Sequence, residues 1–370
     1  MKMNVRLLAT GAAVLCAMSV VQPVPAMASS SGVSVKAPLP ASAYAGLACD
    51  VTDSRLTRTA LPNGVGPEAR VAAACMRLEW LSRASARIPK VTVLTSKGYP
   101  SERAKRISKG IAAGHRLFGA YADVSQYVAL ASRDAAYSCK KGEEITKGRF
   151  VYSQNIRAWD QAYNSGCPGT DYSPSGWTST ILDPGGKTYF AWTLTKSESS
   201  NHFSSDAVLG PMWFLGAVSH EYVHSVQMQR SMSVTNGQES LGRWYGEGQA
   251  QYLGNTAAAY TIGPATIRDA QLAQLREVMK QEGVTRIDLE KLANDWSTGL
   301  VYPAGYFAYE WLVAHYGLER TFTWWNEWNE GCERPGSGTC WRERAPELFG
   351  MSASDLMREL NAYVNAQVKP

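Results

Sequence analysis

The chain has 370 residues, of which 45% are hydrophobic and 19% charged, and its formal net charge is +5. This length is ample for a large core in one two-lobed domain or in two small domains. Basic residues form no run, and acidic residues are scattered among them, so the composition argues against a nucleic-acid groove.

The N-terminus has the features of a secretion signal. Lys2 and Arg6 precede a mostly apolar stretch over residues 7–21, and Ala26-Met27-Ala28 fits an A-x-A cleavage site. We therefore expect residues 1–28 to be removed as a signal peptide and the mature protein to be secreted. Loss of the two basic residues lowers the net charge from +5 to +3. The apolar stretch is short and interrupted, and no later segment predicts a membrane span.

Residues 29–45 are rich in Ser, Ala and Pro and are predicted to be disordered. The mature chain contains six cysteines: Cys49, Cys75, Cys139, Cys167, Cys332 and Cys340. An even number in an exported protein predicts three disulfides, and no C-x-x-C spacing indicates a cysteine zinc site. The sequence does not fix the connectivity. Our hypothesis is pairing in chain order, because each pair is isolated from the others.

Helices and strands alternate in the first part of the mature chain. Periodicity predicts a helix over 67–86, a strand over 90–95, a helix over 101–122 and a strand over 127–132. Residues 139–184 are turn-rich and are expected to be irregular, whereas residues 188–195 form the strongest strand pattern. From residue 237 onward the pattern is helical. Helices are predicted over 241–258, 264–281, 286–295, 303–316 and 353–367, the last capped by Ser352 and Asp355.

Between these two parts, Gly210-Pro211 opens an apolar helix that carries His220-Glu221-Tyr222-Val223-His224. Positions i and i+4 share one face of a helix, so both imidazoles can bind one metal ion. This is the H-E-x-x-H signature of zinc hydrolases, with Glu221 as general base for the water that the metal activates. The alternative is a pair of core histidines, but polar groups inside an apolar helix are costly unless they are satisfied.

Catalytic zinc usually takes three protein ligands and leaves a fourth position to water. The metzincin pattern requires Gly and His where this chain has Gln227 and Arg230, so that pattern is excluded. The other histidines, His115, His202 and His315, lack a recognisable spacing to the motif. The remaining route to a third ligand is a glutamate from a second helix.

The stretch Trp244-Tyr245-Gly246-Glu247-Gly248-Gln249-Ala250-Gln251-Tyr252 resembles the W-x-x-E-G-x-A-x-Y pattern around the third ligand of gluzincin peptidases. The resemblance implies that Glu247 is the third ligand, on a second helix whose small residues allow close approach to the first. Glu239, in a turn-like segment, is the competing candidate. Where thermolysin-like members place an acid that orients a ligand histidine, this chain has Gln251, whose carboxamide oxygen can accept the imidazole N–H.

A third stretch begins with Tyr302-Pro303-Ala304-Gly305 and continues to Tyr316-Gly317. It is similar to the Y-x-x-G helix that follows the ligand glutamate in aminopeptidase-like gluzincins. The resemblance implies that Tyr302 donates a hydrogen bond to the tetrahedral oxyanion, with Tyr306 as the alternative.

The resemblance to the gluzincin (peptidase MA-like) superfamily covers roughly residues 205–320. It implies an α+β, zincin-like fold with zinc held between two lobes. A mixed α/β lobe over 46–235 would carry the H-E-x-x-H helix, and a mainly helical lobe over 236–370 would carry the third ligand. In zincins an edge strand shortly before the motif helix, here residues 188–195, pairs with extended substrate.

These patterns predict a secreted zinc metallopeptidase that acts on peptide or protein substrates. Zn²⁺ would be held by His220, His224 and Glu247, with Glu221 and Tyr302 as catalytic residues. The G-x-M-E-N motif of aminopeptidases is absent, which favours an endopeptidase, and nothing indicates the oligomeric state.

Two other readings stay open. The chain could be a non-catalytic extracellular or cell-wall binding protein on the same scaffold. Its exposed aromatic platform would then come from the cluster Trp324, Trp325, Trp328 and Trp341, although packing against the C-terminal helices is the favoured interpretation of that cluster. The zinc chemistry could also act on another amide, such as a cell-wall peptide.

Overall fold

The computed structural model describes the following residues: 45–56, 66–121, 126–132, 137, 141, 177–182, 187–193, 209–231, 242–262, 267–327 and 340–369, without 85, 89, 294, 296 and 297. The predicted signal peptide lies outside this part of the chain, as does nearly all of the segment predicted to be disordered. Glu239 and His202 also lie outside it.

Four strands form one mixed sheet in the order β1-β2-β4-β3. They are β1 (Lys90–Thr95), β2 (Gln126–Ser132), β3 (Trp177–Leu182) and β4 (Lys187–Thr193). β1, β2 and β4 are parallel, and β3 runs antiparallel to β4 with Leu182 opposite Thr188. All four carry the β-branched and aromatic residues that fit a pleated surface.

The sheet corrects two expectations. Residues 139–184 are not irregular throughout, because β3 lies within them, and β4 is not an edge strand, because it pairs on both sides. The edge position next to β4 belongs to β3 instead. The physical reason is local: only residues 183–186 separate the two strands, so β3 can fold back onto β4 as an antiparallel neighbour.

Most helices agree closely with the expected positions. The exceptions are α8, which has only four residues where a helix over 286–295 was expected, and α10 and the second half of α9, which were not expected. The bounds of the helices are α1 (Pro67–Ser82), α2 (Ser101–Phe118), α5 (Leu209–Ser231), α6 (Arg243–Ile262), α7 (Ile267–Gln281), α8 (Leu289–Leu292), α9 (Val301–Glu327), α10 (Cys340–Phe349) and α11 (Ala353–Val368). As expected, Ser352 caps α11 by accepting a hydrogen bond from the Asp355 N–H at 3.1 Å. Within the described part of the chain, no helix has the length and apolar character needed to cross a bilayer.

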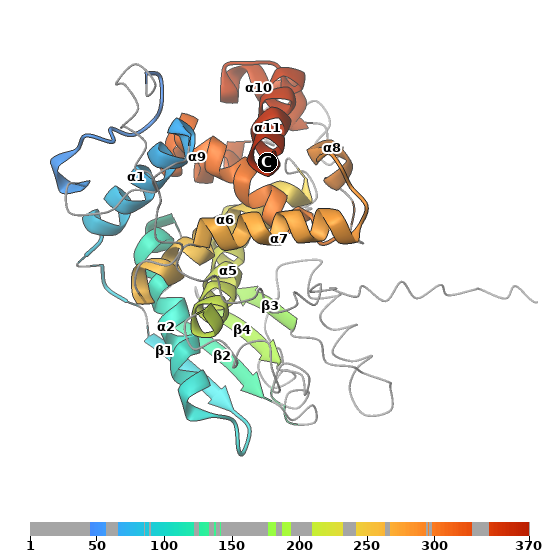
Figure 1. The fold of residues 1–370 in the computed structure, drawn as a ribbon. Coiled ribbons are helices and arrows are strands. Elements are labelled where there is room, and N and C mark those ends of the chain that lie inside the picture. Colours follow the sequence, from blue (N-terminus) through green and yellow to red (C-terminus); the bar gives the residue numbers. More distant parts are fainter. Residues whose placement is uncertain are drawn as a thin grey trace, which may run out of the picture.

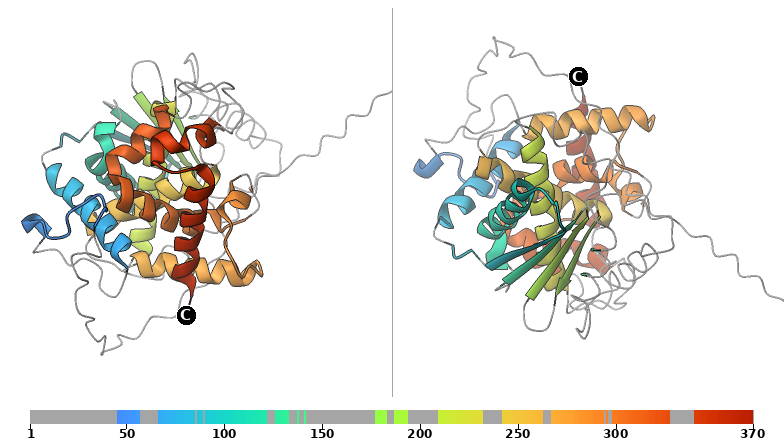
Figure 2. Two further views of the ribbon diagram at one scale, coloured as in Figure 1. Left: turned by 90° about the horizontal axis from the view of Figure 1, so that it is seen from above. Right: turned by 90° about the horizontal axis from the view of Figure 1, so that it is seen from below.

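The sheet lies at one end of the molecule and α9, α10 and α11 at the other, with α5 and α6 between them (Figure 1). The view from below in Figure 2 shows α2 beside the strands. Helix α1 packs on α9, and the buried apolar residues form one cluster that spans both predicted lobes. This shared core fixes the helices that carry the motif residues.

Backbone contact between helices depends on glycines at two crossings. A β-carbon on Gly254 of α6 would lie 2.5 Å from the backbone nitrogen of His220 on α5. A β-carbon on Gly248 of α6 would lie 2.4 Å from the carbonyl carbon of Gly305 on α9. Real β-carbons do not approach backbone atoms this closely, so both crossings require residues without a side chain.

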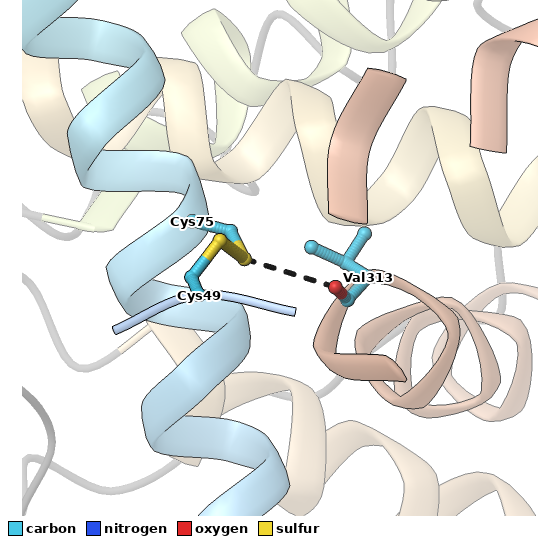
Figure 3. The surroundings of a disulfide bond; sticks show 3 residues. All are labelled: Cys49, Cys75 and Val313. Carbon is cyan, nitrogen blue, oxygen red and sulfur yellow. Dashed lines mark hydrogen bonds between the residues drawn. A yellow bond between two sulfur atoms is a disulfide. The ribbon is translucent and has the colours of Figure 1, made fainter. Parts of the chain in front are cut away.

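A disulfide joins Cys49 to Cys75 at the start of the described chain (Figure 3). It is the first of the three pairs expected from chain order. Cys139, Cys167 and Cys332 lie outside the described residues, as does the side chain of Cys340. The Cys75 sulfur lies 3.8 Å from the Val313 carbonyl oxygen of α9. A disulfide sulfur has no hydrogen to donate, so this is a packing contact.

The disulfide lies beside a break in α9. Gly317 has φ 78° and ψ 164°, which ends the first part of the helix where Tyr316-Gly317 was expected to end it. The break deprives the Ala314 carbonyl of its helical partner, and the Ala48 N–H donates to it at 2.7 Å. The segment tethered by Cys49 therefore satisfies a backbone group that the break exposes.

A buried ion pair connects α7, α9 and α11. The Arg268 guanidinium donates to both carboxylate oxygens of Glu310, at 3.0–3.2 Å, and Tyr363 donates to the same carboxylate at 2.7 Å. Arg268 also donates to Gln367 at 2.7 Å. Only 3% of the Glu310 side chain is exposed, so solvent cannot compensate for the loss of either charge.

We predict that Glu310→Gln lowers the free energy of unfolding by about 3–5 kcal/mol, because it leaves the Arg268 charge buried without a counterion. Glu290→Gln is the matched control. Glu290 pairs with Arg342 at 2.8 Å, but both side chains are nearly half exposed, so its loss should cost less than about 1 kcal/mol. Urea unfolding of both variants with the disulfide intact measures the difference, and equal costs would contradict the prediction.

Candidate metal centre

Two histidines of α5 and one glutamate of α6 converge on one point. The Nε2 atoms of His220 and His224 lie 3.0 Å apart. Glu247 Oε2 lies 3.2 Å from His220 Nε2 and 3.5 Å from His224 Nε2. The close crossing at Gly254, two turns after Glu247 on the same face of α6, brings the two helices within this range.

The hydrogen bonds of the two imidazoles show which ring nitrogen carries the hydrogen and which carries the lone pair. Each Nδ1 faces a carboxamide oxygen that can only accept, Gln251 Oε1 at 3.1 Å for His220 and Gln227 Oε1 at 2.7 Å for His224. Each Nδ1 is therefore the N–H donor, and each Nε2 directs a lone pair to the common point. Two nitrogen lone pairs and a carboxylate oxygen that face one another favour a positive charge between them, either a proton or a metal ion.

The triangle fits zinc. Zn²⁺ binds nitrogen and oxygen at about 2.0–2.1 Å, so tetrahedral coordination separates two ligand atoms by about 3.3–3.4 Å. The three observed separations, 3.0, 3.2 and 3.5 Å, bracket that value. The side chains of His224 and Glu247 remain 24% and 18% exposed, so neither is fully buried.

Electrostatics in the site also favour a positive charge at this point. Burial opposes protonation of His224, but the hydrogen bond and charge of Glu247, with the charge of Glu221, raise its pKa to about 9. Burial likewise acts to raise the pKa of Glu247, yet its contacts with the two histidines hold that pKa well below its usual range. Both shifts have the same cause, the convergence of three ligand groups.

Glu221 lies beside this triangle. A carboxylate oxygen of Glu221 and one nitrogen from each of His220 and His224 all lie within 4.8 Å of one another. Glu247 Oε2 lies 3.2 and 3.5 Å from the two histidine nitrogens, within the range that a shared metal ion requires, so Glu247 is the candidate third ligand. Glu221 is then the carboxylate beside the triangle that is not needed as a ligand.

A buried network of amides and hydroxyls holds His224. Gln227, which accepts from His224, donates to the Gly246 carbonyl at 2.9 Å and to Gln249 at 2.8 Å. Gln249 donates to the Tyr309 hydroxyl at 2.9 Å. On the other side, Gln251 accepts from His220 and donates to Gln271 at 3.3 Å. Carboxamides thus orient both histidines, as the sequence predicted for Gln251 but not for Gln227.

Tyr302 lies at the site and Tyr306 does not. The ring of Tyr302 is 6.1 Å from that of His220, and its hydroxyl accepts a hydrogen bond from Arg243 at 3.1 Å. Tyr306 is buried in the core, 5.0 Å from the ring of Tyr252 and 5.2 Å from that of Phe307. The geometry therefore favours Tyr302 over its alternative.

The other described histidines have separate partners. His115 shares a hydrogen bond of 2.8 Å with the Tyr222 hydroxyl, and His315 stacks on Trp311 with ring centres 3.9 Å apart. Arg243 and Gln227 are the site residues that the sequence reasoning missed. The available signals were their spacings, four residues before Glu247 and three after His224, each about one helical turn.

Comparison with protein-family models, with curated proteins and with solved structures finds no match to this chain. The assignment of the site therefore rests on its residues and their geometry.

Removal of a ligand gives the first test of the site. We expect His220→Ala and His224→Ala to abolish binding of one Zn²⁺ per chain, and Glu247→Ala to weaken it, because each removes a corner of the triangle. Metal analysis after dialysis against a weak chelator measures this. Glu239→Ala is the control and should retain zinc. If it loses zinc while Glu247→Ala keeps it, the third ligand is wrongly assigned.

A second prediction concerns the partner of His220. Gln251→Leu preserves approximate volume but removes the oxygen that accepts from Nδ1, so the imidazole loses its fixed tautomer and orientation. Loss of such a partner typically weakens metal binding by about 10–100-fold. Competition with a fluorescent zinc chelator measures the shift. Gln281→Leu, at the end of α7 with an exposed hydrogen bond to Glu277, is the matched control and should not change affinity.

Proposed function

We propose that this protein is a secreted zinc-dependent endopeptidase on a zincin-like α+β fold. One observation carries the proposal: His220, His224 and Glu247 direct three lone pairs to one point, with Glu221 adjacent. A structural metal site does not require an acid in the position of Glu221, whereas hydrolysis requires a base there.

The roles of the residues follow from their chemistry. When bound, Zn²⁺ supplies Lewis acidity that polarises a carbonyl and lowers the pKa of water. His220, His224 and Glu247 hold the ion, and Gln251 and Gln227 fix the two imidazoles. Glu221 accepts a proton from the attacking water and delivers it to the leaving amine. Tyr302 donates a hydrogen bond to the oxyanion that forms from the substrate carbonyl.

Strand β3 is the candidate for binding extended substrate. It pairs with β4 on one side, and no further described strand pairs with its other side. It also packs against α5, the helix that carries both histidines. A peptide added to this edge would gain backbone hydrogen bonds without side-chain specificity. The sequence pattern assigns substrate pairing to β4; because β3 occupies the edge, we assign it to β3 instead.

Two further observations support the proposal. The Cys49–Cys75 disulfide fits the oxidising environment of an exported protein. The alternative, a non-catalytic binding protein, drew on an exposed Trp platform, but Trp324 and Trp341 are buried, at 0% and 4% exposure. Trp324 packs against Tyr316 and Phe349, with ring centres 5.2 and 4.4 Å away. The remaining members of that cluster lie outside the described side chains.

The decisive variant is Glu221→Gln, which keeps the shape of the side chain but removes the base. We expect it to retain zinc and the fold and to lose about 10²–10⁴-fold in turnover, the usual contribution of a general base. Cleavage of a random peptide mixture at neutral pH, followed by mass spectrometry, measures this and also separates internal from terminal cleavage.

Glu290→Gln, an exposed residue of α8, is the control and should match the wild type. Wild-type protein that holds zinc but cleaves neither peptides nor proteins would favour the binding-protein alternative. Equal activity in the wild type and in Glu221→Gln would show that Glu221 is not the base.

A further inference from the structure

Arg243, the first residue of α6, has a buried and fixed side chain. Only 7% of it is exposed. Its backbone N–H donates to the Ala293 carbonyl at 2.8 Å, and Nη1 donates to the Asp295 carbonyl at 3.0 Å. These two bonds attach Arg243 to the segment that leads from α8 to α9. The backbone of Arg243 and its guanidinium are therefore each held by a backbone carbonyl of that segment.

The guanidinium also contacts residues of the candidate metal centre. Nη2 donates to the Tyr302 hydroxyl at 3.1 Å, and the guanidinium carbon lies 5.4 Å from the centre of the Tyr302 ring. Nε lies 3.9 Å from Glu247 Oε1, while Oε2 of the same carboxylate faces the two histidines. One buried cation thus contacts both the third ligand and the candidate oxyanion donor.

The contact determines how the Tyr302 hydroxyl can act. Arginine has donors and no acceptor, so Tyr302 can only accept from it, and its own hydrogen must point to another atom. A cation next to the phenol also strengthens that hydrogen as a donor to a developing negative charge, because it stabilises the electron density left on oxygen. Arg243 therefore gives Tyr302 the polarity that an oxyanion donor needs.

The contact with Glu247 has a different effect. A carboxylate on a helix can rotate about its side-chain bonds, and rotation would exchange or withdraw the oxygen that faces the histidines. The positive charge 3.9 Å from Oε1 favours the rotamer in which Oε2 completes the triangle. Because Arg243 and Glu247 are separated by one helical turn, the same helix carries the ligand and the group that orients it.

We propose that Arg243 is a positioning residue that orients Glu247 for metal binding and Tyr302 for oxyanion binding at once. The Tyr302 part of this inference rests on the proposed peptidase function, whereas the Glu247 part requires only that the site binds zinc. Arg243 does not touch the reacting atoms in this assignment. It acts through the two residues that it contacts.

The test is a double-mutant cycle between Arg243→Met and Tyr302→Phe. Methionine keeps an apolar chain of similar reach but removes the charge and all donors. Arg243→Met should lower kcat by about 10–100-fold with little change in KM, and should weaken zinc binding by about 10–100-fold in chelator competition. Turnover is measured with saturating zinc. In the Tyr302→Phe background Arg243→Met should lower kcat far less, because the hydroxyl on which it acts is gone.

Two further variants control the cycle. Arg276→Met removes an exposed arginine of α7 and should leave zinc affinity and kcat unchanged. Arg243→Lys retains the charge but lacks the planar fork, and should restore zinc affinity more fully than kcat. Equal losses of kcat in the wild-type and Tyr302→Phe backgrounds would overturn the link to Tyr302, and unchanged zinc affinity would overturn the link to Glu247.

Crystal structures of the wild type and of Arg243→Met, both prepared with zinc, give a readout that needs no activity. We expect the Tyr302 and Glu247 side chains to adopt different or multiple rotamers in the variant. Unchanged rotamers of both residues would refute the inference even if the protein proves to be an active peptidase. An inactive wild type with displaced rotamers in the variant would instead refute the peptidase function and retain the positioning role.

Discussion

Backbone contact between α5 and α6 is the constraint on which the candidate site depends. Gly254 meets the His220 backbone so closely that a β-carbon would lie 2.5 Å from its nitrogen and 2.7 Å from its Cα. Any side chain at this position would push the helices apart. Separations of 3.0–3.5 Å among the three ligand atoms leave no room for such a shift, because a metal ion cannot bridge ligands that retreat by an ångström. The geometry of the candidate metal centre is therefore a consequence of helix packing as much as of residue identity.

Glycines also allow close backbone contact where α6 meets α9. Gly248 and Gly305 lie face to face, and each removes the side chain that would separate the helices. Gly248 follows Glu247 directly, and Gly305 lies one turn after Tyr302, so this crossing sets the distance between the third ligand and the tyrosine. Arg243 occupies the space between them and is held by backbone carbonyls before α9. Three helices in contact thus present their polar residues at one place.

The sequence could predict those candidate site residues whose positions depend on spacing along one helix. His220 and His224 share a helix face by periodicity alone, whereas Glu247 and Gln251 were predicted from the resemblance of residues 244–252 to the gluzincin pattern. The spacing of Arg243 from Glu247 was a local signal, but its contact with Tyr302 could not be found this way, because Tyr302 is 59 residues away and no spacing rule connects the two. Strand β3 was missed because its six residues lie within a turn-rich segment, where the short run of β-branched residues was not separated from its surroundings.

The residues that hold the histidines are neutral, and this affects the balance of charge. Gln227, Gln249, Tyr309 and Thr321 form a continuous chain of hydrogen bonds from His224 to α9, and Gln251 holds His220. A carboxylate in either glutamine position would raise the basicity of the imidazole and transfer electron density to the ligand atoms. Carboxamides orient the rings without that transfer, and Arg243 opposes the charge of Glu247 as well. A cation held by these residues would therefore keep more of its Lewis acidity but would bind less tightly. The buried hydrogen-bond network offsets part of this loss of affinity, because it fixes the ligand side chains in place before an ion binds.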